Sequence, residues 1–300
     1  MLQMGQTIIK TNKLTKYYGK NLGIENLDLE VREGEIFGFL GPNGAGKSTT
    51  IKLLLNFIKP TSGSATVFGL NPEHNIVDIN QDIGYLPGEV HMYEQLSGFA
   101  HLKFQAQLQD SVGWSYVEEL GQRLQADFKK SIKALSHGNK QKIALIGALM
   151  NKPKLLILDE PTTGLDPLVQ QEFYKILAEA NRSGTTVFIS SHILPEVERI
   201  CDRVAIIREG KLVLTEEINV LKNKAERPVE VFFKDKPRKE DFEQIPGVTQ
   251  LSLEGNSLRC VIAGSYDQFL KAVAKYEVSN LITQEPSLEK IFLGYYKGGN

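Results

Sequence analysis

The segment from Gly41 to Thr49, GPNGAGKST, carries the clearest chemistry in this sequence. It matches the pattern G-x-x-x-x-G-K-[ST], in which glycines let backbone N–H groups point at phosphate oxygens without obstruction by a Cβ atom. Lys47 would reach the β- and γ-phosphates of a nucleotide, and the Ser48 hydroxyl would bind Mg²⁺. The pattern predicts a nucleotide cradle made of Gly41, Pro42, Asn43, Gly44, Ala45, Gly46, Lys47, Ser48 and Thr49.

Two adjacent carboxylates, Asp159 and Glu160, follow the apolar segment LLIL. Ligands bind at the carboxyl ends of strands in open α/β sheets, so both side chains are expected to face the cradle. Asp159 is predicted to belong to the magnesium shell, and Glu160 to act as the general base that activates an attacking water. His192 ends the segment VFISSH and is predicted to contact the γ-phosphate or that water. The structural alternative is that the two acids only cap a turn before Pro161.

An aromatic pair lies upstream of the cradle, in KYYGK. Tyr17 and Tyr18 are placed where an aromatic ring could stack on the nucleotide base. The alternative is a buried tyrosine at the end of a strand.

A second helix start with anion-binding character lies at LSHGNKQK, Leu135–Lys142. Ser136 is a natural N-cap, Gly138 permits a close approach, and two lysines add positive charge before an apolar helical run. One nucleotide needs only one cradle. This second helix start is therefore an anion site without a phosphate of its own.

These residues need a scaffold, and the sequence predicts strands that alternate with helices. In the segment Ile24–Val31, Leu27, Leu29 and Val31 alternate as in a half-buried antiparallel strand. Other strands are predicted at 7–11, 35–40, 83–87, 155–161 and 185–192, with a hairpin at 204–214; helices are predicted at 47–58, 94–136 and 195–201. Continuous apolar strands alternating with helices predict a parallel sheet covered on both faces, which is an α/β fold.

The composition changes to a charged linker near Lys222–Arg227. Beyond it the patterns read strand, helix, strand, strand, helix, strand, which is the order of a small α+β ferredoxin-like unit. A last helix is predicted at 285–296, with an apolar stripe made of Leu288, Ile291, Phe292 and Tyr295. Two domains are therefore expected, at 5–221 and 228–297.

Composition excludes several classes of protein. The 300 residues carry a net charge of −1, so no nucleic acid partner is expected from bulk charge. The two cysteines, Cys201 and Cys260, lie in apolar patterns without metal spacing and are expected to be buried thiols in a reducing compartment. No run approaches the roughly 18 apolar residues of a membrane span, and no signal peptide is evident. A cytoplasmic protein that can dock on a membrane protein is expected.

Taken in order, the GPNGAGKST, LSHGN, LDE, TGLD and SSH motifs resemble the ATP-binding cassette (ABC) family over about residues 5–220. The N-K-x-D guanine reader of a GTPase is missing, and the paired acids suit water activation better than a small-molecule kinase. The resemblance implies a P-loop NTPase with an antiparallel β subdomain and a helical subdomain at about 89–150. It also implies a head-to-tail homodimer in which the signature motif of one subunit, here Leu135–Asn139, clamps ATP held by the other.

The resemblance assigns further roles and exposes two departures. Tyr18 would stack on adenine, Ser136, Gly138 and Asn139 would bind the partner's ATP, Asp166 would contact the dimer partner, and His192 would be the switch histidine. His137 and Asn139 replace the glycine and glutamine of the usual signature LSGGQ, and both can still form hydrogen bonds. Gly88 stands where the family places a glutamine that binds magnesium, and the adjacent Glu89 is the candidate replacement for it.

The tail beyond the cassette resembles that of cassette subunits in bacterial exporters of drugs, antibiotics or peptides. Such subunits join separate membrane permease subunits at the inner face of the cell membrane. A helical segment from Tyr93 to Phe104 would pass the motion to that partner, although Tyr93, Phe99 and Phe104 are equally expected in the core. The alternatives are a soluble cassette acting in translation or DNA maintenance, and a regulatory module that binds ATP without turnover.

Overall fold

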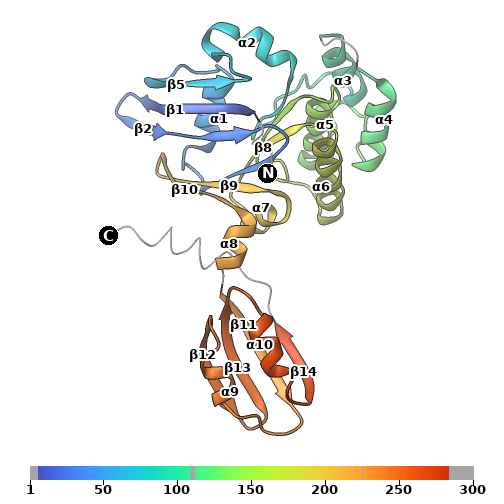
Figure 1. Ribbon diagram of the computed structural model, residues 1–300. Helices are drawn as coiled ribbons and strands as arrows, with labels where there is room; N and C mark the ends of the chain where they lie inside the picture. The colour runs from blue at the N-terminus through green and yellow to red at the C-terminus, as the bar shows by residue number, and fades with distance from the viewer. Residues whose placement is uncertain (1–5, 109–111, 225, 284–300) are drawn as a thin grey trace. The chain divides into compact units, whose positions relative to one another are not determined.

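The computed structural model describes residues 6–108, 112–224 and 226–283. The chain divides into two compact units, Met1–Thr215 and Glu216–Asn300, which are described separately (Figure 1). Among the residues so described, no helix combines the length and the apolar character needed to cross a bilayer.

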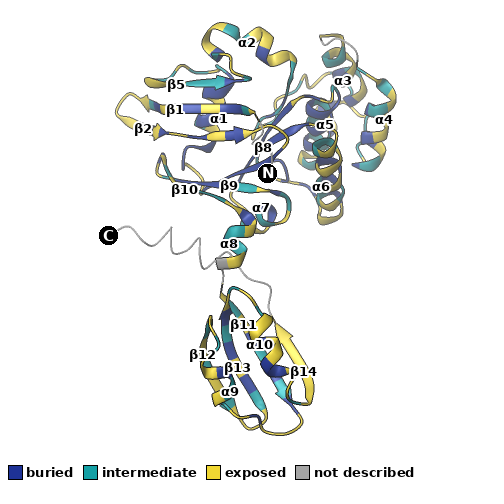
Figure 2. Ribbon diagram, viewed as in Figure 1, coloured by how far each residue is buried: buried dark blue, intermediate teal, exposed yellow. Residues whose placement is uncertain are grey.

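A six-stranded sheet forms the centre of the first unit, in the order β10-β9-β4-β8-β7-β6. Strands β9, β4, β8, β7 and β6 pair in parallel, which confirms the predicted α/β fold. Their bounds are β4 Ile36–Leu40, β6 Ile83–Leu86, β7 Leu155–Asp159, β8 Thr186–Ser191, β9 Arg203–Arg208 and β10 Lys211–Glu217. Every residue of β4, β7 and β8 is buried (Figure 2), as their continuous apolar sequences require.

Helices pack against this sheet and hold the loops that follow its strands. Helix α1 packs against β7, α6 against β8, α7 against both β4 and β8, and α5 against β6. Their bounds are α1 Lys47–Leu54, α5 His137–Leu149, α6 Pro167–Arg182 and α7 Leu194–Ile200. Burial of the apolar faces of these helices fixes the loops at the carboxyl ends of the strands, where the predicted site lies.

An antiparallel sheet forms a subdomain of its own around the long strand β1, Thr7–Tyr18. Strands β2 (Asn21–Leu27), β3 (Glu30–Arg32) and β5 (Ser62–Val67) all pair with β1. The single strand predicted at 24–31 was wrong, because the chain breaks into β2 and β3 at Asp28. The Asp28 carboxylate accepts a hydrogen bond from the Lys13 N–H at 2.6 Å, and the two short strands pair with different parts of β1.

Short helices make up the predicted helical subdomain: α3 Gly98–Gln107, α4 Trp114–Arg123, the 3₁₀ turn η1 Ile132–Ala134, and α5. A further helix, α2 (Pro72–Gln81), lies between β5 and β6. Arg123 joins α4 to α6 through ion pairs to Glu172 at 2.7 Å and Glu179 at 2.5 Å. These contacts hold the helical subdomain against the sheet domain.

The second unit contains a four-stranded antiparallel sheet in the order β12-β13-β11-β14. Its elements are α8 Ile218–Lys224, β11 Glu226–Phe233, α9 Glu240–Glu243, β12 Val248–Glu254, β13 Ser257–Ala263, α10 Asp267–Val273 and β14 Val278–Thr283. Phe242 and Phe269 lie fully buried in its core. The segment predicted as a charged linker is partly helical, and the helix predicted at 285–296 lies outside the described residues.

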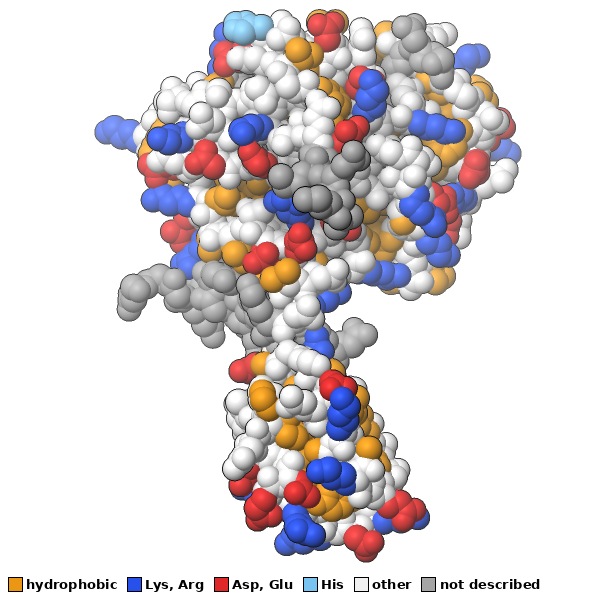
Figure 3. Space-filling model, viewed as in Figure 1, with side chains coloured by type: hydrophobic (Ala, Val, Ile, Leu, Met, Phe, Trp, Pro, Cys, Tyr) orange, Lys and Arg blue, Asp and Glu red, His pale blue; other side chains and the backbone are white. Residues whose placement is uncertain are grey.

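Charged side chains are mixed on the visible surface. On the face drawn in Figure 3, Lys and Arg lie interspersed with Asp and Glu over both units. Among the described residues of this face, no patch of one sign has the size expected of a nucleic acid interface.

Candidate nucleotide site

The phosphate cradle is the loop that joins β4 to α1. Gly44 and Gly46 both adopt positive φ, at 79° and 111°. A Cβ atom on Gly46 would lie 2.6 Å from Ile24 Cγ2 and 2.8 Å from the Gly23 carbonyl oxygen. Only glycine fits this position, so the loop can turn its N–H groups inward ahead of α1.

Lys47, the first residue of α1, is folded into the cradle. Its ammonium group donates hydrogen bonds to the carbonyls of Gly41 at 2.7 Å and Pro42 at 3.2 Å. It also forms an ion pair with Glu160 Oε1 at 3.1 Å, although its side chain is only 6% exposed. This ammonium lines the cavity above the cradle, where it can exchange the Glu160 carboxylate for the negative charge of a phosphate.

A cavity of about 260 Å³ opens above the cradle. It is lined by Tyr18, Leu22, Gly23, Asn43, Gly44, Gly46, Lys47, Ser48, Thr49 and Glu160. Tyr18 is 46% exposed, and its hydroxyl lies 3.4 Å from Thr49 Oγ1. The alternative of a buried tyrosine was therefore wrong. Tyr17 instead donates its hydroxyl to Glu25 Oε1 at 3.0 Å, which leaves Tyr18 as the candidate for base stacking.

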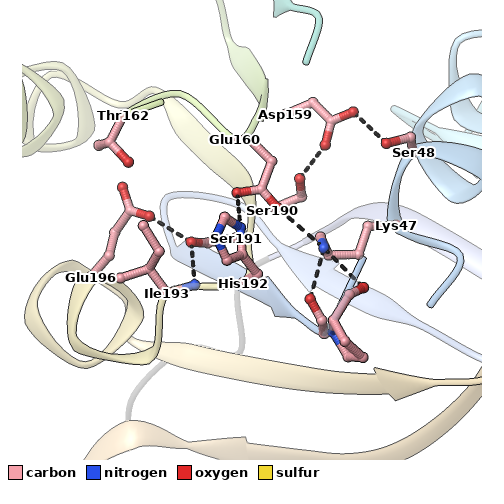
Figure 4. Close-up of polar contacts among 12 residues, drawn as sticks. Lys47, Ser48, Asp159, Glu160, Thr162, Ser190, Ser191, His192, Ile193 and Glu196 are labelled. Carbon is pink, nitrogen blue, oxygen red and sulfur yellow. Dashed lines mark hydrogen bonds and ion pairs between the residues drawn. The ribbon is translucent and has the colours of Figure 1, made fainter. Parts of the chain in front are cut away.

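Oxygen atoms that suit a magnesium ion converge beside the cradle. Ser48 Oγ donates a hydrogen bond to Asp159 Oδ2 at 2.7 Å, and Ser190 Oγ donates one to Asp159 Oδ1 (Figure 4). In the described part of the chain no three His, Cys, Asp or Glu side chains gather as a metal cage. Mg²⁺ typically binds one or two carboxylates together with substrate phosphates, so Ser48 and Asp159 fit it.

The pair Glu160 and His192 lies at the ends of β7 and β8. Glu160 Oε2 is 2.7 Å from His192 Nδ1, and the backbone N–H of Glu160 donates to the Ser190 carbonyl at 3.1 Å. Glu160 has a φ of 51°, which is uncommon for a residue with a Cβ atom. This backbone directs its carboxylate between Lys47 and His192 (Figure 4).

The side chain of Glu89, the predicted replacement for the missing glutamine, points into solvent. The side chain of Glu89 is 92% exposed and lies 3.8 Å from His91. Gly88 is the residue that faces the metal position, since a Cβ atom on it would lie 3.2 Å from Asp159 Oδ2. The loop after β6 turns the backbone of Gly88 toward Asp159 and leaves the next side chain in solvent.

The predicted second anion site corresponds to the start of α5. Ser136 caps this helix, and its Oγ accepts a hydrogen bond from the Asn139 N–H at 3.3 Å. A cavity of about 680 Å³ opens here, lined by Asp127, Lys130, Ala134, Leu135, Ser136, His137, Gly138, Asn139, Lys142, Gly164 and Asp166. It shares no lining residue with the cavity above the cradle.

The side chain of Asn139 forms hydrogen bonds to the backbone of its own chain. Its Oδ1 accepts from the Asp127 N–H at 3.0 Å, and its Nδ2 donates to the Asp127 carbonyl at 3.2 Å. Both ends of the amide are thus used within the chain, and binding of the partner's ATP by Asn139 stays a prediction. Asp166 caps α6 by accepting from the Val169 N–H at 3.0 Å, and it lies 3.9 Å from the Lys142 ammonium.

Position 138 has room only for glycine, because the loop that precedes α6 passes close to it. A Cβ atom on Gly138 would lie 2.4 Å from the carbonyl oxygen of Gly164. The start of α5 and the loop that carries Asp166 are therefore in direct contact.

Three residues around the site were missed by the sequence patterns: Ser190, Ser191 and Glu196. Ser190 and Ser191 end β8 with their side chains fully buried, and Glu196 is 4% exposed. For Ser190 and Ser191, the signal available in the sequence was a pair of hydroxyl side chains at the end of a largely apolar strand. Nothing local distinguishes Glu196 from other helix glutamates.

Comparison with known proteins yields close relatives. Residues 24–163 match the family model described as ABC transporter. The chain is 42% identical over 210 residues to the "Bacitracin transport ATP-binding protein BcrA" of Bacillus licheniformis, covering 69% of each chain. It is 31% identical over 295 residues to the "Uncharacterized ABC transporter ATP-binding protein YhaQ" of Bacillus subtilis (strain 168), covering 95% of this chain and 97% of that one. A solved "Structure of ATP binding subunit of ABC transporter" matches with a TM-score of 0.66 and 28% identity, over 72% of this chain and 92% of that chain.

Proposed function

The chain belongs to the ABC transporter family as an ATP-binding and ATP-hydrolysing subunit, and from this premise we propose that it powers export of a small molecule, drug, antibiotic or peptide. The cargo would cross through separate membrane permease subunits, with this chain bound at the inner face of the cell membrane. The relative named for bacitracin transport supports this class of cargo. The observation that supports the ATP-hydrolysing part of the proposal is that the cradle and the serine-capped start of α5 line two separate cavities in one chain.

The residues around the cradle divide the work of hydrolysis. The Gly41–Thr49 backbone and the Lys47 ammonium bind the phosphates and offset the charge that develops on them. Glu160 takes a proton from the attacking water, and His192, 2.7 Å away, keeps that carboxylate oriented. When bound, Mg²⁺ supplies further neutralisation of the phosphates, and Ser48 and Asp159 are the residues that would hold it.

Two copies of the chain would complete each other's sites. The cavity at Ser136 has a serine-capped helix start and the Lys142 ammonium, but lies apart from the cradle of its own chain. In a head-to-tail homodimer it would face the triphosphate bound by the partner subunit. Asp166 lines the same cavity and would meet the partner at the same interface.

Mixing two inactive variants tests this arrangement. In a head-to-tail dimer, Lys47→Ala destroys a cradle and Ser136→Arg blocks a signature helix. A mixed dimer of the two variants keeps one intact composite site, so mixing should restore ATPase activity that neither variant has alone. No restoration, in mixtures that light scattering shows to be dimeric, would contradict composite sites. The wild-type chain mixed with each variant serves as the control.

A third cavity, of about 420 Å³, is the candidate contact for the membrane subunit. Three buried polar atoms around it have no hydrogen-bond partner among the described residues: His101 Nδ1, Gln105 Oε1 and Asn151 Oδ1. Tyr93, Phe99 and Phe104 are 60%, 43% and 40% exposed, so the expectation that they belong to the core was wrong. Unpaired buried polar atoms beside exposed aromatic rings are typical of an interface that a partner completes.

Purification of the tagged chain from membranes tests the export proposal. The wild-type chain should bring down a protein with several membrane spans, and Phe104→Asp should abolish its recovery. Val77→Asp, on the 73% exposed Val77 of α2, is the matched control and should retain the partner. Repeated recovery of the wild-type chain alone, from the soluble fraction, would instead favour a soluble non-transport cassette.

A further inference from the structure

A buried carboxylate that the proposed mechanism does not use lies directly behind the catalytic pair. Glu196 is in the first turn of α7, and its side chain is 4% exposed. Its Oε2 accepts a hydrogen bond from Ser191 Oγ at 2.6 Å, and its Oε1 accepts one from the Tyr174 hydroxyl at 3.4 Å. The Thr162 hydroxyl points toward this carboxylate (Figure 4) and helps to hold its pKa down. One carboxylate thus joins the end of β8, helix α6 and the segment after β7.

Ser191 passes the effect of Glu196 to the turn that carries His192. Its hydroxyl donates to Glu196 and at the same time accepts from the Ile193 N–H at 3.0 Å (Figure 4). His192 lies between Ser191 and Ile193, so this pair of bonds closes the turn around the histidine. The Ser191 carbonyl also accepts from the Gly41 N–H at 3.2 Å, at the start of the cradle.

Thr162 connects Glu196 to the chain that follows Glu160, the other member of the catalytic pair. It lies two residues after Glu160 and is 3% exposed. Because Glu160 has a left-handed backbone, the segment that follows it must be fixed for its carboxylate to keep its direction. Glu196 therefore contacts the chain next to both Glu160 and His192.

Burial of this carboxylate is expensive, which makes a packing role a poor explanation for it. Burial raises the pKa of the Glu196 carboxyl, and the negative charge of Glu160 adds to the rise, whereas hydrogen bonds from Ser191, Thr162 and Tyr174 oppose it. Apolar residues of similar volume often replace buried ionisable groups at no cost in stability. A glutamate at this position is better explained by the hydrogen bonds that it accepts.

We propose that Glu196 is a positioning residue for ATP hydrolysis, which aligns His192 through Ser191 and the chain after Glu160 through Thr162. The inference rests on the proposed hydrolytic function. It makes Glu196 a determinant of turnover that contacts neither nucleotide nor metal. Misplacement of a catalytic group by about 1 Å can cost on the order of 100-fold in rate.

The test compares Glu196→Met and Glu196→Gln with wild type in the full-length chain. Methionine fills a similar volume without accepting these bonds, and it should lower kcat about 10- to 100-fold while the KM for ATP changes less than about twofold. Glutamine keeps one oxygen that can accept from Ser191, so it should recover part of the loss. Glu73→Met is the matched control, because Glu73 is an exposed glutamate that also follows a proline in the first turn of a helix. It should behave as wild type.

A double-mutant cycle separates positioning from general damage. If Glu196 acts through His192, Glu196→Met should lower single-turnover hydrolysis much less in a His192→Ala background than in wild type. An unchanged kcat in both Glu196 variants, or a change confined to the KM for ATP, would overturn the proposal. So would a double variant whose rate loss equals the product of the losses caused by Glu196→Met and His192→Ala. A wild-type chain without ATPase activity would refute the proposed function itself. An active wild-type chain with active Glu196 variants would refute only the role of Glu196. If Glu196→Met fails to fold, the glutamine variant and its cycle with His192→Ala decide.

Discussion

Replacement of Glu160 by glutamine is the sharpest test of the proposed chemistry. The substitution keeps the shape of the side chain and removes its charge and its capacity to accept a proton. The carboxylate lies 3.1 Å from the Lys47 ammonium and 2.7 Å from His192 Nδ1, with 19% of its side chain exposed. A general base contributes about 10²- to 10⁴-fold to the rate. At about 1.36 kcal/mol for each tenfold, this corresponds to about 2.7–5.4 kcal/mol in the activation barrier.

ATP binding should survive this substitution, because the cradle contacts come from the Gly41–Thr49 loop. The loss of the Glu160 charge also frees the Lys47 ammonium for phosphate, so affinity should stay equal or rise. The variant should therefore accumulate as an ATP-bound dimer. Single-turnover release of phosphate measures the rate, and size-exclusion chromatography with ATP measures the dimer; Glu73→Gln is the control. Turnover at the wild-type rate would remove Glu160 from the mechanism, and loss of ATP binding would show that its role is structural.

Two further substitutions test the cradle and the scaffold. Lys47→Ala should abolish ATP binding as measured by fluorescence of a labelled nucleotide, and near-normal affinity would contradict the cradle assignment. Arg123→Met should lower the free energy of unfolding by about 1–2 kcal/mol near neutral pH, because it removes charge-assisted hydrogen bonds that are partly exposed. Arg123 holds the pKa of its two glutamate partners on α6 below the ordinary 4.5, so the contribution is present above that value and is lost as the pH falls through the lower, folded-state pKa. Denaturant titrations of both proteins should converge below pH 4.5, and a constant difference would argue against the ion pairs.

Much of the fold and of the cradle is readable from the sequence because the relevant signals are local. The apolar strands 36–40, 155–159 and 186–191 are continuous, and each ends directly in residues with chemistry. Parallel pairing brings those ends to one edge of the sheet. Lys47, Ser48, Asp159, Glu160 and His192 therefore lie together in the structure as the patterns predict.

The remaining features depend on contacts that no local pattern contains. The side chain of Asn139 is taken up by the backbone of Asp127, twelve residues earlier. Glu89 faces solvent because the loop after β6 turns Gly88 toward Asp159. The sequence does not reveal which of these two neighbouring residues will face Asp159. Glu196 differs from an exposed helix glutamate only through Ser191 and the other hydroxyls that meet it in the folded chain.

The close approach of Gly138 to the Gly164 carbonyl has a consequence for how two nucleotides in a dimer would sense each other. There is no free space at that point, so the helix start that would face a partner's ATP in the proposed dimer cannot shift without displacing the loop beside it. That loop begins a few residues after the subunit's own Glu160. Occupancy of one site would then be transmitted mechanically to the base of the other, and hydrolysis at the two sites would proceed in a coordinated order rather than independently.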